Sequence, residues 1–442
     1  MTDVTAEHAP ERTAARSAFD AAAMAARVAK RRAAEWRFQA YGIAAISFGL
    51  FCVLMLFGVI ISKGLPAFWQ SAIQLDVALD PAVVDAAGAR SHDDLMAADY
   101  ESLIRAALYK KLGIAPEDAA KTALADDLVS SGADVDVRQL VLDNHAVIGT
   151  TQRIWLLTHD TVDAVLKGAI DRKVPESNRQ IKDQQLAWVD QLVADGAIKS
   201  GFNWGLFTRG ASSKPETAGL GVAAIGSFFM MLTVLLVAVP LGVAAAIYLE
   251  EFAPKNRWTD LIEVNISNLA AVPSIVFGLL GLAILINFVG LPRSASLVGG
   301  LVLALMTLPT VIIAARAAIT AVPPSIRQAA LGIGASKMQS IFHHVLPLAM
   351  PGILTGTIIG LAKALGETAP LLMIGMVAFV VDYPKTPMDP ATALPVQIYM
   401  WSSAQERGFV ERTSGATMVL LLFLLAMNLI AVILRRRFER KW

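Results

Sequence analysis

Long apolar runs alternate with shorter polar segments along most of this chain of 442 residues. About 20 apolar residues suffice for a helix to cross a bilayer. Six runs reach that length, at residues 40–62, 221–248, 266–289, 297–319, 351–381 and 416–434. With 55% hydrophobic residues, the chain is too apolar for a single soluble domain. We therefore predict an all-α polytopic membrane protein with six transmembrane helices, in which residues 221–434 form a core of five spans.

Residues 63–220 break this pattern, because they are charge-rich and carry more acidic than basic residues. Helical spacing is visible at residues 99–112, 116–129 and 178–195, and short strands are expected at 137–142 and 153–158. Glycine and proline are not frequent enough for a linker. We predict a folded inserted domain, mainly helical or mixed α/β, with disorder as the lesser alternative. Its histidines are scattered, which predicts no metal site.

The distribution of basic residues predicts the orientation. Residues 1–39 and 435–442 are rich in arginine, and the polar loop 322–349 carries Arg327 and Lys337 without an acidic residue. Positive residues favour the cytoplasmic side, so both termini and this loop are expected there, with residues 63–220 outside. The N-terminal segment is expected to contact anionic lipid; nucleic-acid binding is disfavoured because acidic residues are interspersed. Since a polar stretch precedes the first apolar run, we expect no cleavable signal peptide.

Several classes of chemistry find no support in the sequence. The lone Cys52 lies in an apolar run, which rules out an intramolecular disulfide framework. The run GIGASK does not have the spacing of a phosphate-binding loop, so the chain is not expected to bind ATP. A nucleophile elbow, a zinc-protease motif and a dinucleotide fingerprint are also missing from the sequence. The chain is therefore predicted to be a non-enzyme without a cofactor or metal of its own.

The loop at residues 322–349 has the pattern of a helix, a glycine bend and a second helix. Pro323 and Pro324 end the preceding span. Ser325 is expected to cap the first helix in a capping box with Gln328. A second helix is expected at residues 335–345, closed by Leu346-Pro347. An ordinary helical hairpin between spans and a structured docking loop both fit this spacing.

Lys363 and Glu367 are charges inside an apolar run, and charges within spans usually serve a function. Four residues apart, they would share one helix face and pair. A pathway that attracts an anion and a salt bridge between helices are both compatible with this position. Asn268 in the third run is expected either to bond a neighbouring helix or to line the pathway. Arg316 lies near the inner end of the fourth run, where its side chain can reach the interface.

These motifs resemble a known family. Gln328-Ala329-Ala330, Gly334 and Leu346-Pro347 match in spacing the coupling-loop signature of ABC importer permeases, with Gln328 at the usual Glu and His344 at the usual Ile. The run GLAKALGETAPLL resembles the phosphate-specific permeases, above all the PstA-type subunit, with Lys363 at the usual Arg. The resemblance covers residues 219–442 and the first span.

The resemblance implies an ABC importer permease (MetI-like) fold and a role as the transmembrane subunit of a binding-protein-dependent importer of inorganic phosphate in the bacterial inner membrane. It implies three partners: a paralogous PstC-type permease, a dimer of PstB-type ATPase that binds ATP and magnesium, and a PstS-type phosphate-binding protein. Coupling to the ATPase would involve Gln328, Ala329, Ala330, Gly334, Leu346 and Pro347. The substrate pathway would involve Lys363, Glu367, Thr368, Asn268 and Arg316.

Other functions remain open at this point. A permease for another oxyanion, such as sulfate or molybdate, would share the loop, although GETAPLL favours phosphate. An ion-coupled secondary transporter could use Lys363 and Glu367 as a proton relay, but it would leave the loop unexplained. A membrane sensor would need a signalling module at one terminus, and neither terminal segment is long enough to hold one.

Overall fold

The computed structural model describes residues 9–438 except 87 and 89, and it divides into two compact units, Met1–Ile60 and Ile61–Trp442. The first unit is a single helix, α1, whose bounds are Ala9–Gly64. The predicted first span, residues 40–62, lies inside this helix, and its apolar side chains are exposed, as expected of a segment that faces lipid. The helix therefore extends well into the basic segment that precedes the span.

The insertion folds around a three-stranded antiparallel sheet of order β2-β1-β3, formed by β1 (Trp69–Ala78), β2 (Thr151–Leu157) and β3 (Ile198–Phe202). In register, Leu75 lies opposite Ile154 and Ser71 opposite Ser200. The strand predicted at residues 153–158 is thus confirmed. The strand predicted at 137–142 is wrong: this segment belongs to α6 (Ala133–Asp143), where Val137 and Val141 are buried on one helix face. Residues four apart would also share one face of a strand, but Val135 and Gln139, which would lie on that same strand face, are exposed, so the burial follows a helix.

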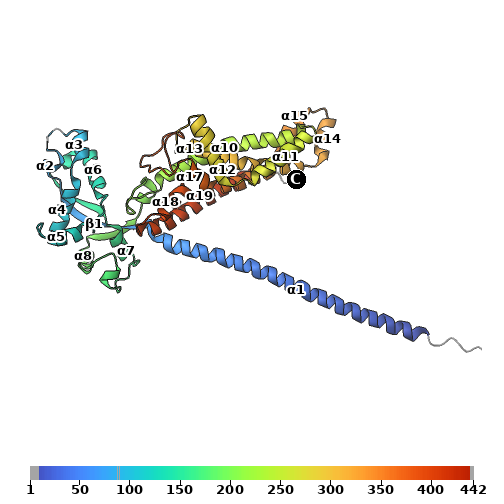
Figure 1. The fold of residues 1–442 in the computed structure, drawn as a ribbon, viewed down its shortest axis with the longest axis horizontal. Coiled ribbons are helices and arrows are strands. Elements are labelled where there is room, and N and C mark those ends of the chain that lie inside the picture. The colour runs from blue at the N-terminus through green and yellow to red at the C-terminus, as the bar shows by residue number, and fades with distance from the viewer. Residues whose placement is uncertain (1–8, 87, 89, 439–442) are drawn as a thin grey trace, which may run out of the picture. The chain divides into compact units, whose positions relative to one another are not determined.

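Seven helices in the described part of the insertion surround this sheet (Figure 1). The helices predicted at residues 99–112, 116–129 and 178–195 are confirmed with shorter bounds. They are α4 (Tyr100–Leu112), α5 (Ala119–Asp126) and α8 (Asp183–Ala194). The others are α2 (Pro81–Val84), α3 (His92–Ala97), α6 and α7 (Asp160–Leu166). Their buried side chains, among them Leu75, Tyr100 and Val189, form one apolar core. The insertion is therefore a folded mixed α/β domain, and disorder is excluded for its described residues.

The core is a bundle of apolar helices. Its long members are α10 (Gly221–Ile247), α13 (Ser296–Thr320), α16 (Leu346–Gly366) and α19 (Gly408–Phe438). Shorter helices are α9 (Gly205–Thr208), α11 (Arg257–Ala270), α12 (Ser274–Leu280), α17 (Ala369–Met373) and α18 (Leu394–Ser402). Among the described residues, five helices are long and apolar enough to cross a membrane, or six if the bent pair formed by α11 and the helix after it counts as one span.

Two predicted spans differ from the structure. The third, residues 266–289, is not one helix: α11 stops at Ala270, and the helix from Ser274 to Phe288 leaves at 103°. Pro273 is the N-cap residue of α12, and proline disfavours a helical conformation in the residue before it. The fifth, residues 351–381, starts earlier and ends sooner than predicted, because α16 stops at Gly366. Both breaks, the bend after Ala270 and the end of α16 at Gly366, lie inside apolar runs, so hydropathy alone does not detect them.

The long helices pack closely through small residues. A Cβ added to Gly242 of α10 would lie 2.7 Å from Val311 Cγ1 of α13, and one on Gly352 of α16 would lie 2.6 Å from Ala318 Cβ. Small residues permit close backbone approach, the main source of helix association where lipid removes the hydrophobic driving force. The α10–α13–α16 stack is thus the tightly packed centre of the core.

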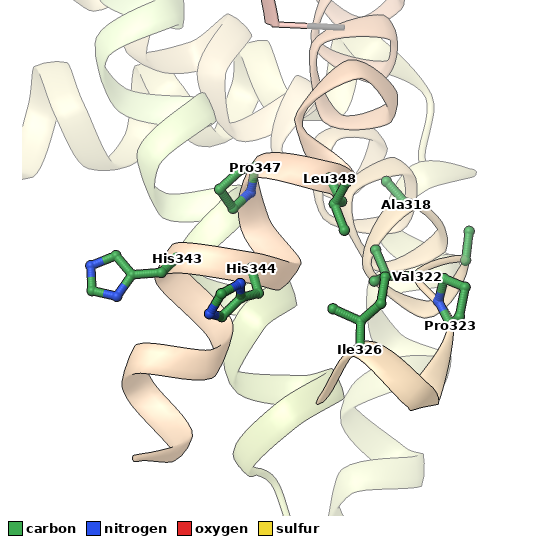
Figure 2. A pocket seen from close by; sticks show the side chains of 9 residues that line it. Ala318, Val322, Pro323, Ile326, His343, His344, Pro347 and Leu348 are labelled. Carbon is green, nitrogen blue, oxygen red and sulfur yellow. The ribbon is translucent and has the colours of Figure 1, made fainter. Parts of the chain in front are cut away.

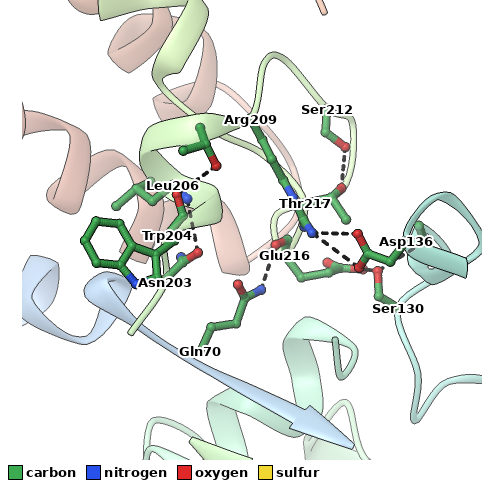
Figure 3. Close-up of polar contacts among 12 residues, drawn as sticks. Gln70, Ser130, Asp136, Asn203, Trp204, Leu206, Arg209, Ser212, Glu216 and Thr217 are labelled. Carbon is green, nitrogen blue, oxygen red and sulfur yellow. Dashed lines mark hydrogen bonds and ion pairs between the residues drawn. The ribbon is translucent and has the colours of Figure 1, made fainter. Parts of the chain in front are cut away.

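Polar contacts join the insertion to this core through residues 203–217 (Figure 3). Arg209 Nη2 donates to Asp136 Oδ1 of α6 at 2.9 Å. The carboxylate of Glu216 accepts from Ser130 Oγ at 2.8 Å, while its backbone carbonyl accepts from Gln70 Nε2 at 2.6 Å. Leu206 and Leu220 are buried against Leu394 and Trp401 of α18. The last part of the predicted domain 63–220 therefore packs on the bundle rather than in the insertion's own core.

Candidate functional site

The polar segment after α13 folds as the predicted helix, bend and helix, but its caps differ. The first helix, α14, spans Pro324–Gly332, and Gly334 turns the chain with φ +90°, a conformation that favours glycine. Ser325 does not cap it: Pro323 is the N-cap residue and Pro324 the first helical residue, where a missing N–H costs nothing. The capping box lies instead in α15 (Lys337–Ser340), between Ser336 and Gln339.

Leu346-Pro347 was expected to close the second helix, and this is wrong. The π-helical turn η6 (Ile341–Val345) runs directly into α16, which begins at Leu346. Pro347 lies at the second position of α16, and the wider π turn before it accommodates the ring without ending the helix. The second helix and the following membrane helix are therefore continuous, so displacement of α15 would act directly on α16.

Apolar packing and one arginine hold this segment against the bundle. Ile341 and Val345 are buried with Ile319 and Val322 in a small apolar cluster. Arg327 of α14 bonds the Glu251 carboxylate, with Nε at 2.9 Å and Nη2 at 2.8 Å. Its other bonds reach the carbonyl oxygens of Val322, at 2.6 Å, and Ile319, at 2.8 Å. Arg327 thus caps the end of α13 and ties α14 to the turn that follows α10.

The outer face of the segment keeps apolar side chains in solvent. Ile333 is 84% exposed, and Leu331, Met338 and Phe342 are about half exposed. Beside them lies a hollow of about 630 Å³. Figure 2 shows Val322, Ile326 and Leu348 on one side of this hollow and His343 and His344 on the other. Exposed apolar groups gathered on one such face indicate a protein contact.

The predicted coupling residues fall into three environments on this segment. Gln328 and Ala329 are exposed on α14, whereas Ala330 is buried against the bundle. Gly334 forms the exposed bend, and Leu346 and Pro347 are half-buried at the start of α16. The structure brings them onto one hairpin, and only the first two and the bend are accessible to a partner.

Arg316 of α13 is committed to ion pairs within the chain. Its Nε lies 2.7 Å from Glu250 Oε1, and its Nη2 lies 2.8 Å from Glu263 Oε1 of α11. The sequence reasoning did not single out these two glutamates, although two carboxylates that flank an apolar run are an available signal. With both carboxylates in place, Arg316 joins α11 and α13 to the turn η4 (Tyr248–Phe252), which follows α10.

Lys363 and Glu367 do not share a helix face, contrary to the prediction. α16 ends at Gly366, and Glu367 has extended backbone angles (φ −84°, ψ 120°). Among the described residues, neither side chain has an ion pair or a hydrogen bond in the structure. Lys363 is exposed and Glu367 half-buried, and Thr368 follows as the N-cap residue of α17. The broken helix thus presents an uncompensated cation beside free polar groups.

Asn268 lies apart from that break, exposed in the last turn of α11 just before the bend. The structure brings Arg316 to α11 through Glu263, and it places Lys363, Glu367 and Thr368 together at the α16–α17 junction. The described contacts therefore do not bring the five predicted pathway residues together at one site. Among the described residues, no cluster of histidine, cysteine or carboxylate side chains could hold a metal ion.

Two family models match the chain. The model described as binding-protein-dependent transport system inner membrane component matches residues 238–442, which hold most of the core. A second, described as a domain of unknown function, matches residues 25–176, which hold the first span and much of the insertion. The chain is thus a multi-pass inner membrane component of a binding-protein-dependent transport system, and its N-terminal part matches a second family model.

Individual relatives agree with the first model. The phosphate transport system permease protein PstA of Mycobacterium leprae is 31% identical over 294 residues, which cover 62% of this chain and 95% of that protein. PstA 1 of Mycobacterium tuberculosis H37Rv is 31% identical over 57% of this chain and 80% of its own length. The probable ABC transporter permease YqgI of Bacillus subtilis is 31% identical, and the chain spans 60% of its length.

Proposed function

The chain belongs to the PstA family of phosphate transport system permeases, and from this we propose that it is the transmembrane subunit of an ATP-driven importer of inorganic phosphate. In this role it cycles between inward-open and outward-open states that ATP and the loaded binding protein bias. The observation that carries the proposal is the helical hairpin at residues 324–345, with its exposed apolar face and its continuity with α16.

The hairpin supports an ATPase partner. A docked ATPase would cover Leu331, Ile333 and Met338, which are exposed in the single chain. A push on α15 passes into α16 without an intervening loop, because η6 and α16 are continuous. This subunit needs no nucleotide of its own, since ATP and magnesium belong to that partner.

The orientation follows from charge. The basic residues at both ends of the chain and Arg327 and Lys337 on the hairpin favour the cytoplasmic side. The insertion then lies outside, where a phosphate-binding protein docks. A bacterial inner membrane is the corresponding location.

Lys363 supports an anionic substrate and a second permease. A charge costs about 3 kcal/mol in a helix centre surrounded by hydrocarbon. Lys363 is exposed in the single chain without a carboxylate partner among the described residues, so we expect it to face an aqueous pathway closed by a paralogous subunit. There it attracts phosphate, while Glu367 and Thr368 offer a competing carboxylate and a hydroxyl.

The decisive experiment is uptake of labelled phosphate by vesicles that carry the complete assembly, with internal ATP. We expect uptake that needs ATP, is displaced by unlabelled phosphate, and resists a hundredfold excess of sulfate or molybdate. Competition by sulfate would assign the importer to another oxyanion. Uptake that follows a proton gradient without ATP would replace the proposal by an ion-coupled transporter.

A further inference from the structure

A cavity of about 540 Å³ lies where the insertion meets the start of α19. Asp160, Asp163 and Lys167 line it from α7 and its flank, and Arg407, Glu411 and Arg412 line it from the start of α19. The last turn of α1 contributes Lys63, and the 3-10 turn that follows it (Leu65–Phe68) contributes Pro66. The cavity is therefore built by several segments that are far apart in the sequence, and the proposed transport function does not use it.

The carboxylates of this cavity are all engaged. Asp163 and Glu411 share Lys167, at 2.6 and 2.7 Å from its Nζ. Asp160 lies 2.8 Å from His159 Nδ1, and Glu216 accepts from the Ser130 hydroxyl. These four negative charges are held by groups of the chain itself, so they are not free to bind a cation.

Three cations that line the cavity, Arg412, Lys63 and Arg407, form no ion pair with another described residue. Arg412 is only 5% exposed; its Nη2 donates to the Glu216 carbonyl at 3.3 Å, and its Nη1 has no partner in the described part of the chain. Lys63 and Arg407 are exposed at the rim, and neither forms an ion pair with another described residue. The carboxylates of Glu411, Asp163 and Glu216 act on Arg412 electrostatically, but the buried Nη1 donor itself is unsatisfied in the described part of the chain. A buried donor without an acceptor is costly, and an anion in the cavity would supply that acceptor.

Several aromatic side chains follow the edge of this cavity along the chain. Pro66 lies at its edge, and Trp69 follows on β1, where it meets Phe202 edge to face at 6.2 Å between ring centroids. Phe202 in turn packs on Trp204, whose side chain is 69% exposed. Exposed aromatic rings of this kind gather at the level of lipid head groups.

We propose that the cavity binds a phosphate-bearing anion, either the head group of an anionic phospholipid or free inorganic phosphate. Arg412 Nη1 is the buried donor, and Lys63 and Arg407 close over the anion from the rim. Guanidinium groups suit this role because their planar N–H donors match phosphate oxygens. The anion neutralises Arg412 and bridges the insertion to α19, so its occupancy stabilises the join between them.

The test uses the purified full-length chain in nanodiscs and the double variant Lys63→Ser/Arg407→Ser, whose two side chains are exposed and form no ion pair with another described residue. Lys173→Ser, an exposed cation of the insertion outside the cavity, is the matched control. Native mass spectrometry measures retained phosphatidylglycerol, and calorimetric titration measures inorganic phosphate. We expect at least tenfold weaker binding of one of these probes in the double variant and unchanged binding in the control.

The two sources give different results. Retention of phosphatidylglycerol but not phosphatidylcholine assigns a lipid head group, and saturable phosphate binding in zwitterionic nanodiscs assigns the free anion. Phosphate binding that is lost with Lys363→Met but kept in the double variant would belong to the transport pathway and overturn the proposal. Equal binding of both probes by wild type and double variant would also overturn it. Arg412→Gln, if it folds, should abolish the binding.

Discussion

Two regions of the core contain basic and acidic side chains, but in the described part of the chain these are paired in one region and unpaired in the other. Beside α14, Arg316 and Arg327 are bonded to Glu250, Glu263 and Glu251. At the α16–α17 break, Lys363 and Glu367 are close in sequence but have no ion pair among the described residues. In an apolar bundle, a charge satisfied by its own chain stabilises that chain, whereas an unsatisfied one needs something from outside. The comparison therefore assigns structure to the first region and substrate or partner contact to the second.

The largest effect is expected from removing the unpaired cation. Lys363→Met keeps the side-chain volume and removes a charge that has no ion pair with another described residue. A hydrogen bond to a charged group is worth up to about 3 kcal/mol, which corresponds to about a hundredfold in rate. We expect phosphate uptake by the complete assembly to fall by that factor while the unfolding temperature of the chain stays the same.

Glu367→Gln is the companion variant, because it keeps the shape of the carboxylate and removes its charge. We expect it to change the rate of uptake without impairing assembly. If Lys363→Met transported normally but unfolded earlier, the cation would be structural and the contrast between the two regions would disappear.

The opposite result is expected from the paired region. Arg327→Met leaves the Glu251 carboxylate, which is 9% exposed, without its partner, and frees two carbonyl groups at the end of α13. Breaking one side of such a pair costs about 3 kcal/mol. Thermal unfolding of the chain in detergent should show this loss directly.

A double variant sharpens the Arg327 result. Arg327→Met/Glu251→Gln removes the stranded charge, so it should recover part of the lost stability. If the double variant lost as much stability as Arg327→Met and Glu251→Gln together, the pair would carry no coupling energy. The Arg327–Glu251 contact would then contribute nothing to the stability of the chain.

The sequence predicts most of the fold because hydropathy and positive charge depend on composition over long windows. It finds α10 and α13 almost to the residue, since each is one straight apolar run. It misses the bend before Ser274 and the stop at Gly366, because both lie inside apolar runs and depend on local backbone geometry. The helix at residues 137–142 was missed because, over only six residues, Val137 and Val141 would share one face of a strand as well as one face of a helix.

In the candidate site, too, local sequence predicts some features, whereas others depend on contacts between distant segments. The hairpin at residues 324–345 could be predicted, because proline and glycine mark its ends and its bend. The partners of Arg316 and Arg327 could not, since Glu250 and Glu251 lie more than 60 residues away and only the packing of α10 against α13 brings them together. The cavity beside Arg412 was equally beyond prediction, because several segments that are distant in the sequence build it.

A moderate effect is expected on the exposed face of the hairpin. Ile333→Ser replaces a side chain that is 84% exposed in the single chain. Burying an isoleucine at an interface is worth about 1.5–3 kcal/mol, so we expect the purified ATPase to bind at least tenfold more weakly. Val135→Ser, on an exposed position of α6, is the control and should leave binding unchanged. Equal affinities for Ile333→Ser and wild type would place the docking surface elsewhere.

The smallest effect is expected in the insertion. Its His159–Asp160 pair depends on the protonation of a histidine, whereas the ion pairs of the core are formed by arginines. The hydrogen bond and charge of Asp160 raise the pKa of His159 against the opposing effect of its burial. A raised folded-state pKa means that this contribution is complete below about pH 6.5, the unfolded value, and is lost as the pH rises through the folded value. We expect a loss of about 1 kcal/mol or less in the free energy of unfolding across that range. His159→Gln should flatten this pH dependence in chemical unfolding of the full-length chain. If the free energy of unfolding of that variant kept the same pH dependence, another group would be titrating. The His159–Asp160 pair would then make no measurable contribution to stability.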